Sequence, residues 1–344
     1  MPIAQGNNRT ALITGATGFI GQHLVDALLL RDWQITALVL QGEEPPAHWI
    51  NKVKLVVGDI RTLASLEQQV GDIDTVFHLA AIVSDWGATS EHIDITVNGT
   101  RQAITLALKK HAHFVVTTSI AAYASNLGRG LINENMPHGK PSSAYERCKQ
   151  QQEQVTLDAV AFHQLQATLI RPGNVYGVGS KPWVERLSTL IKSGSPVILG
   201  KGDWDAGLCH VDNLIQLMIL AATRAHPNGQ IYNAADGFGV TWIQYITHLT
   251  QALGLPKAKH VPRGIAQYSA PILEAIAHLT KRKEPPVLTR LAYRLMGENS
   301  IFSIGKAKYQ LGYRPVTTFE QAMSQLAQVH LSSIEDKPTV DRSK

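Results

Sequence analysis

Three side chains in the first half of the sequence have the types and spacing needed for proton transfer. Tyr145 and Lys149 are four residues apart in a predicted helix, so they share a face. A tyrosine has a pKa of about 10, and a nearby ammonium lowers that pKa by favouring the phenolate. The tyrosine can then exchange a proton with a carbonyl or a hydroxyl. Ser119 ends a predicted strand, where its hydroxyl can hold the substrate oxygen.

A glycine-rich segment at residues 14–21 lies between the first predicted strand and the first predicted helix. Gly15 suits the tight turn, Gly18 lets the backbone approach a pyrophosphate, and Gly21 lets the helix pack closely on the sheet. The positive end of the helix faces the phosphates. A plain strand-to-helix turn needs only one glycine, so three at this spacing predict a dinucleotide site. A Tyr/Lys pair alone is common by chance, and the glycine segment is what gives it weight.

The choice between NAD and NADP depends on the end of the second predicted strand, Val39-Leu40-Gln41. This segment contains neither an Asp for the ribose hydroxyls nor an Arg for a 2′-phosphate. Glu43 and Glu44 follow, and they would repel a phosphate that they faced. The sequence therefore favours NAD and leaves NADP open. Asp59, after the third predicted strand, is a candidate to hydrogen-bond the adenine and equally a candidate helix cap.

The elements around these residues alternate between strand and helix, which is typical of right-handed crossovers in a parallel sheet. We therefore predict an α/β protein with a Rossmann-like doubly wound parallel sheet and a smaller C-terminal substrate-binding lobe. The predicted dinucleotide-binding domain covers 8–172 plus later returning segments, the lobe covers 173–330, and a flexible tail covers 332–344. Strands are predicted at 10–14, 35–40, 54–57, 75–79, 114–118 and 168–170, and helices at 19–31, 93–110 and 143–163.

Composition excludes several classes of protein. Of the 344 residues, 44% are hydrophobic and 17% are charged, so the chain is neither disordered, nor a coiled coil, nor collagen-like. Two cysteines, Cys148 and Cys209, cannot form a disulfide framework or a zinc ribbon, and we predict no metal site. We see no secretory signal at the start and no apolar run of about 20 residues that could span a bilayer. We therefore expect a cytoplasmic protein.

The basic charge is concentrated late in the chain. Residues 255–315 contain 11 Lys/Arg and 3 Asp/Glu, although the whole chain has a net charge of only +5. Two amphipathic helices are predicted there, at 271–283 and 285–296, with Lys281, Arg282 and Lys283 between them. They suit a lid over a hydrophobic substrate, a peripheral contact with an anionic membrane, or an ordinary solvated face. In the second helix Val287, Leu288, Leu291, Ala292 and Leu295 form the apolar stripe, and Arg290 and Arg294 share another face.

Taken together, these motifs resemble those of the extended short-chain dehydrogenases/reductases. That branch includes nucleotide-sugar epimerases, dihydroflavonol reductases and 3β-hydroxysteroid dehydrogenases, and the late segment is similar to the last of these. The resemblance extends over about residues 10–325. The matching segments are 14–21, 58–59, 78–81, 97–100, Ser119, Tyr145 with Lys149, 171–177, 210–213 and 311–315.

The resemblance implies roles for individual residues. Ser119, Tyr145 and Lys149 would be catalytic, and Lys149 would also hold the nicotinamide ribose. Asn98 is expected to support helix packing, Asp212 to cap a helix, Cys148 to be a packed thiol, and Tyr123 either to pack or to approach the substrate. The residues expected to bind the cofactor are Gly15, Thr17, Gly18, Phe19, Ile20, Gly21, Asp59, Ile60, Leu79, Ala80, Ala81, Asn98, Thr118, Tyr145, Lys149, Pro172 and Val175.

The expected function is an NAD(P)-dependent oxidoreductase that interconverts a secondary alcohol and a ketone on a hydrophobic, sterol-like or β-keto/β-hydroxy substrate. The alternative is a nucleotide-sugar epimerase or dehydratase with tightly bound NAD. The segment 204–209 lacks the arginine that a diphosphate would favour, although Lys181, Arg186 or Lys201 could replace it. A non-catalytic dinucleotide sensor is the remote alternative. The expected partner is a small molecule rather than a nucleic acid, and a homodimer is the default assembly.

Overall fold

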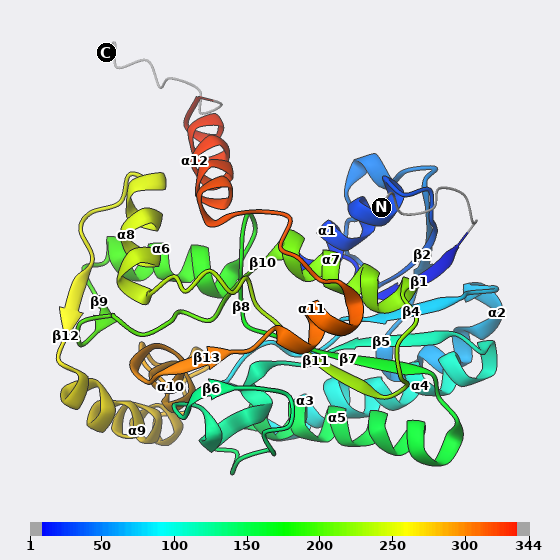
Figure 1. Ribbon diagram of the computed structural model, residues 1–344, viewed down its shortest axis with the longest axis horizontal. Helices are drawn as coiled ribbons and strands as arrows, with labels where there is room; N and C mark the ends of the chain where they lie inside the picture. Colours follow the sequence, from blue (N-terminus) through cyan, green and yellow to red (C-terminus); the bar gives the residue numbers. More distant parts are fainter. Residues whose placement is uncertain (1–8, 336–344) are drawn as a thin grey trace.

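A parallel sheet of seven strands forms the centre of the computed structural model, which describes residues 9–335 (Figure 1). The strand order is β11-β7-β5-β4-β1-β2-β3, and every neighbouring pair is parallel. This confirms the predicted doubly wound class. Six strands lie where the sequence predicts them, and the seventh, β11, comes from the second half of the chain. The strands are β1 (Thr10–Thr14), β2 (Gln34–Val39), β3 (Val53–Val57), β4 (Thr75–His78), β5 (His113–Thr117), β7 (Ala167–Pro172) and β11 (Gln230–Ala234).

Helices cover both faces of this sheet, because its strands are apolar on both sides (Figure 1). On one face lie α1 (Phe19–Leu29), α7 (Val211–Thr223) and α11 (Gly305–Leu311). The other face is covered by α4 (Gly99–Lys110) and α5 (Ala144–His163). The short helices α2 (Glu67–Val70) and α3 (Thr89–His92) complete this part, and α3 continues into α4 through a π-helical segment, Ile93–Asn98. The predicted helix at 93–110 therefore begins four residues earlier.

A third apolar core lies in the second half of the chain, at the left of Figure 1. One small two-stranded pair lies within this part, and another, β13 with β6, joins the late chain to the main body. In residues 9–335 no helix has both the length and the apolar character to cross a bilayer. Helix α12 (Phe319–Glu335) extends into the predicted tail, and residues 336–344 lie outside the described part. The remaining elements are β6 (Gly130–Ile132), β8 (Asn174–Tyr176), α6 (Arg186–Lys192), β9 (Pro196–Leu199), β10 (Leu208–His210), α8 (Trp242–Ala252), β12 (Lys259–Val261) and β13 (Ser300–Phe302).

The two predicted basic helices have other bounds than expected. Helix α9 (Arg263–Leu279) begins well before Pro271, which lies inside it, and helix α10 (Arg290–Gly297) begins only after the Thr289 cap. The segment between them contains Pro285 and Pro286, and proline disfavours helix for the residue before it. Val287, expected in the apolar stripe of the second helix, is therefore outside that helix and 53% exposed.

The start of α5 is specified by its own sequence. Ser143 accepts a hydrogen bond from the backbone N–H of Glu146, and the Glu146 carboxylate accepts one from the N–H of Ser143. This reciprocal pair satisfies two donors at the helix end. It places Tyr145 in the first turn, and Lys149 follows one turn later on the same face.

Further along α5, the buried carboxylate of Glu153 joins the helix to the sheet. It accepts hydrogen bonds from the Thr118 hydroxyl (2.8 Å), from two nitrogens of Arg171 (2.8 and 2.6 Å) and from His138 (2.6 Å). Burial by itself would raise the pKa of Glu153, but the hydrogen bonds and charges of Arg171 and His138 outweigh burial and lower the pKa to about 2.

We expect Glu153→Gln to lower the free energy of unfolding by about 3–5 kcal/mol, because it leaves the Arg171 charge buried and unpaired. The loss should be full above pH 4.5 and should shrink as the pH falls towards 2, since the lowered pKa stabilises the fold only while Glu153 is ionised. Urea denaturation over this pH range measures the effect. The exposed Glu185→Gln is the control, and equal losses in the two variants would contradict the prediction.

Candidate active site

Ser119 and Tyr145 meet at the carboxyl end of the sheet. Ser119 lies two residues after the end of β5, and its hydroxyl accepts a hydrogen bond from the N–H of Ala121 at 3.0 Å. Burial raises the pKa of Tyr145, a side-chain hydrogen bond with Ser119 acts in the opposite direction, and the charge of Asp85 raises the pKa further. Tyr145 is therefore a neutral phenol that can donate a proton.

Lys149 is almost fully buried, and its ammonium lies 6.0 Å from the centre of the Tyr145 ring. It donates hydrogen bonds to the carbonyl of Thr117 at 3.2 Å and to Oε1 of Gln152 at 2.8 Å. Burial lowers the pKa of Lys149 to about 8, against the opposing charge of Glu153. The expectation that Lys149 lowers the pKa of Tyr145 is wrong for this state, because the direction at Tyr145 is upward and is set by burial.

A chain of buried hydrogen bonds connects Lys149 to the glycine segment. Gln152 accepts a hydrogen bond from the Lys149 ammonium through Oε1, and its Nε2 donates one to the Thr100 hydroxyl at 3.0 Å. Thr100 contacts Nε2 of His78 at 2.9 Å, and Nδ1 of His78 contacts the Thr14 hydroxyl at 2.8 Å. Burial lowers the pKa of His78 to about 3, so the imidazole is neutral. Sequence reasoning missed this chain, because its members come from β1, β4, α4 and α5.

The glycine segment has the shape of a phosphate cradle. Gly15 has a φ of +70°, and a Cβ there would lie 2.9 Å from the backbone nitrogen of Ala80. A Cβ on Gly21 would lie 2.1 Å from the Gly15 carbonyl oxygen, so the α1 backbone must pass close to the turn. Gly18 caps α1 without any side-chain hydrogen bond, which leaves its first N–H groups for a ligand. The segment therefore fits a dinucleotide pyrophosphate, as its sequence predicts.

Glu43 lies beside this cradle. It follows the end of β2 by four residues, and the sequence alone does not show that its side chain turns back towards the glycine segment. Its carboxylate accepts hydrogen bonds from the Thr17 hydroxyl at 2.8 Å and from the N–H of Leu40 at 2.9 Å. A carboxylate at the end of the second strand binds ribose hydroxyls and repels a 2′-phosphate. Glu43 therefore places a carboxylate beside the cradle, although β2 itself ends without an acidic residue.

Other predicted cofactor residues fall into two groups. Ala80 and Leu79 donate to the Thr14 hydroxyl (3.3 and 3.2 Å) and so lie beside the cradle. The Asp59 carboxylate instead accepts a hydrogen bond from the N–H of Arg61 at 2.8 Å. This bond caps the helical turn that follows, which is the second of the two roles expected for Asp59. Five further residues of the predicted set lie at or after the carboxyl ends of strands at this edge of the sheet, and they are buried or partly buried. They are Phe19, Ile20, Ala81, Pro172 and Val175.

Three of the predicted residues are engaged elsewhere. The Thr118 hydroxyl donates to Glu153, and the Ile60 side chain packs under Gly99, where a Cβ would meet it at 2.9 Å. Asn98 is exposed and its amide donates to Asp94 at 3.5 Å, one turn earlier in the same helical stretch, so the expectation that it supports helix packing is wrong. It lies on the outward side of the π-helical segment, whose turns differ from those of an α-helix.

The other expectations for single residues have mixed outcomes. Tyr123 is fully buried and donates to Oδ1 of Asn233 at 2.7 Å, so it packs rather than facing a substrate. His210, not Asp212, caps α7, because its side chain accepts from the N–H of Asp212 at 3.3 Å. Cys148 is a buried thiol, as predicted.

A cover from distant segments lies over Tyr145. Asp85, whose charge acts on Tyr145, accepts a hydrogen bond from Thr289 at the start of α10. Arg294 of α10 donates to Glu146 at 2.5 Å, next to Tyr145 in α5. Arg186 donates to the carbonyl of Pro286 at 3.0 Å, and its charge acts on Asp85. The segment around α10 is therefore hydrogen-bonded to residues beside Tyr145, and whether it acts as a lid stays a prediction.

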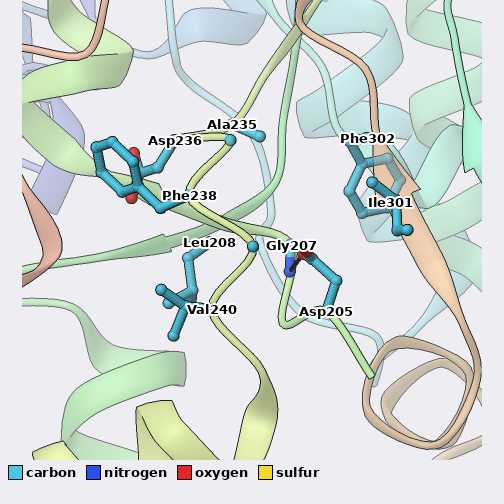
Figure 2. Close-up of a pocket in the computed structure, with 11 residues that line it drawn as sticks. Asp205, Gly207, Leu208, Ala235, Asp236, Phe238, Val240, Ile301 and Phe302 are labelled. Atoms are coloured by element: carbon cyan, nitrogen blue, oxygen red, sulfur yellow. Dashed lines mark hydrogen bonds between the residues drawn. The ribbon is translucent and has the colours of Figure 1, made fainter. Parts of the chain in front are cut away.

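Figure 2 shows a separate cavity of about 240 Å³ between β13 and the segment that follows β11. Phe302 and Ile301 line one side, and Phe238 and Leu208 line the other. Its charged lining groups are the carboxylates of Asp205 and Asp236, with no lysine or arginine. None of Ser119, Tyr145 and Lys149 lines it. This cavity is therefore not suited to a diphosphate. Its lining includes Asp205, Gly207 and Leu208, which belong to the 204–209 segment that lacks an arginine.

A parallel sheet of this order, with a glycine cradle at its switch point and a buried Tyr/Lys pair beside it, defines a dinucleotide-dependent oxidoreductase. The sequence model of the NAD dependent epimerase/dehydratase family matches residues 11–235. The chain belongs to this family, and the resemblance to extended short-chain dehydrogenases/reductases is confirmed.

Relatives span almost the whole chain. A 4-hydroxy-2-methyl-3-oxo-4-farnesyl-3,4-dihydroquinoline-1-oxide ketoreductase from Stigmatella aurantiaca is 26% identical, covering 92% of this chain and 95% of its own. A 3-beta-hydroxysteroid dehydrogenase from Mycolicibacterium neoaurum is 28% identical, covering 91% and 89%. The crystal structure of UDP-glucuronic acid 4-epimerase from Bacillus cereus in complex with NAD has a TM-score of 0.72 at 20% identity, covering 94% and 99%.

We expect a comparison with Lys149→Met to show how much the burial of the Lys149 ammonium lowers the free energy of unfolding. Between pH 8 and pH 10.5 the unfolded chain binds more protons at Lys149 than the folded chain, so the stability of the wild type should rise with pH. Relative to Lys149→Met, the free energy of unfolding should increase by up to about 3 kcal/mol across this range. Denaturant titrations at several pH values measure it. The exposed Lys192→Met should show no such trend, and a flat difference for Lys149 would refute the assignment.

Proposed function

We propose that this protein is an NAD-dependent oxidoreductase that interconverts a ketone and a secondary alcohol on a hydrophobic substrate. The observation that carries the proposal is the neutral phenol of Tyr145, whose pKa Ser119 influences and whose ring centre lies 6.0 Å from the Lys149 ammonium, on the side of the sheet where the glycine cradle lies. Tyr145 has the position and protonation state of a general acid.

The bound nicotinamide would supply the hydride to the carbonyl carbon, or accept it in the reverse direction. In reduction, Tyr145 gives its phenolic proton to the carbonyl oxygen, which becomes the hydroxyl of the product. The Ser119 hydroxyl holds that oxygen in place. The Lys149 ammonium then stabilises the phenolate that remains until a proton returns from solvent. Asp85 favours the neutral phenol, so it prepares Tyr145 for proton donation.

The apolar surroundings support a hydrophobic substrate. Tyr145, Leu79, Val175 and Leu295 are partly buried and pack against the same apolar core. The relatives named as a farnesyl-quinoline-oxide ketoreductase and a hydroxysteroid dehydrogenase act, by their names, on large apolar molecules. A substrate of this class would take the place of solvent beside these side chains.

The nucleotide-sugar alternative has one feature in its favour. The charge of Arg186 acts on Asp85, whose own charge acts on Tyr145, and a diphosphate would need a cation in this part of the molecule. However, Arg186 donates a hydrogen bond to the carbonyl of Pro286, and its charge already acts on Asp85. An epimerase would retain NAD through purification and would consume neither NADH nor NADPH, so release of NAD on denaturation distinguishes the two functions.

We expect Tyr145→Phe to lower turnover by about 10²–10⁴-fold, because it removes the transferred proton and leaves the cradle intact. The measurement is NADH absorbance with a panel of steroid and β-keto ketones, together with NADH binding followed by fluorescence. Binding should be nearly unchanged. Tyr309→Phe, at a 90% exposed position, is the matched control. Unchanged turnover in Tyr145→Phe would defeat the proposed mechanism.

We expect Glu43→Gln to shift the cofactor preference towards NADPH, by about tenfold in the ratio of kcat/KM values for NADH and NADPH. The substitution removes a charged acceptor for the ribose hydroxyls together with the repulsion of a 2′-phosphate. Glu44→Gln changes the neighbouring exposed carboxylate and is the matched control. If both variants shift equally, or neither shifts, Glu43 does not select the cofactor.

A further inference from the structure

Helix α9 presents an apolar face to solvent. Five large side chains on it are each more than half exposed, and we call them the α9 stripe. Their spacing of three, four, four and three residues places all of them on one side of the helix. The stripe consists of Ile265 (60%), Tyr268 (74%), Ile272 (58%), Ile276 (52%) and Leu279 (84%).

The inward face of α9 has the opposite character. Ala266, Ala270 and Ala277 are buried against the lobe, and Glu274 pairs with Arg290 at 2.5 Å. The small residues thus point inward and the large apolar ones outward, so the stripe is not needed to pack the lobe. Contiguous apolar faces of this kind mark sites where another surface binds.

The charges at the end of the stripe indicate what that surface is. Lys281, Arg282 and Lys283 follow α9 directly and are exposed, and within the described side chains no carboxylate forms an ion pair with any of them. Arg290 and Arg294, which the sequence placed in the same basic group, are instead paired with Glu274 and Glu146. Lys281, Arg282 and Lys283 are therefore cations beside the stripe that remain free to contact a partner surface.

We propose that the α9 stripe and Lys281–Arg282–Lys283 dock on the surface of an anionic lipid bilayer. The apolar side chains would enter the boundary between headgroups and acyl chains, and the three cations would contact anionic headgroups. A second copy of this chain is a poorer occupant, because it would add three more cations to the contact rather than anions that pair with Lys281, Arg282 and Lys283.

The docking surface is connected to the candidate active site. Trp86 stacks on His278 of α9 at 4.2 Å and donates a hydrogen bond to the carbonyl of Arg282 at 2.9 Å. Trp86 follows Asp85, which contacts Thr289 and acts on Tyr145. The bilayer would thus lie next to the cover of the site, and an apolar substrate of the proposed class could enter from lipid. Docking itself does not depend on the proposed reaction.

The test is co-sedimentation of the full chain with phosphatidylglycerol/phosphatidylcholine vesicles and with pure phosphatidylcholine vesicles. The wild type should bind the anionic vesicles, and binding should weaken as salt is added. Ile272→Ser/Ile276→Ser should weaken it by about tenfold or more, because apolar area drives insertion. Lys281→Gln/Lys283→Gln should abolish the preference for anionic vesicles without touching any packed residue.

Two control pairs match these variants. Leu30→Ser/Tyr309→Ser removes exposed apolar side chains elsewhere, and Lys201→Gln/Lys308→Gln removes exposed charges elsewhere. Both should bind like the wild type, and so should Tyr145→Phe, so a failure of docking and a failure of the proposed reaction remain distinguishable. Absence of wild-type binding, or equal binding by the α9 variants, would overturn the proposal. So would a change from dimer to monomer in Ile272→Ser/Ile276→Ser by analytical ultracentrifugation, which would make the stripe a protein interface.

Discussion

One buried carboxylate determines where the helix of the candidate site lies. Glu153 receives hydrogen bonds from the end of β5, through Thr118, and from β7, through Arg171. A buried carboxylate is stable only when its oxygens are paired, so α5 has one position on the sheet at which these bonds form together. Lys149 and Tyr145 lie one and two turns before Glu153 on the same helix, and their position follows from it.

The candidate site combines a polar, hydrogen-bonded floor with a cover from remote parts of the chain. The floor is the series from Lys149 through Gln152, Thr100 and His78 to Thr14, and it links Lys149 to the glycine cradle. Fully satisfied buried networks of this kind hold their members in one arrangement. The cover is attached by hydrogen bonds between segments far apart in the chain, among them Thr289 with Asp85 and Arg294 with Glu146. It joins the floor to the exposed helix α9.

Much of this arrangement could be predicted because its determinants are local. The glycines at 14–21, the strand-and-helix rhythm and the four-residue spacing of Tyr145 and Lys149 each act within one element or one turn. The Ser143 cap likewise follows from its neighbour Glu146. The pKa of Tyr145 could not be predicted in the same way, because burial by distant segments reverses the effect expected from a nearby lysine.

The sequence by itself determined the fold class, the dinucleotide cradle and the residues of the proposed reaction. These depend on periodicity and on short spacings that the backbone translates directly into geometry. Only the tertiary structure decided that Glu43 reaches Thr17, that Asp85 acts on Tyr145, and that α9 turns its large apolar side chains outward. The physical reason is that contacts between remote segments depend on loop paths and on competition for burial, and neither leaves a regular pattern along the chain.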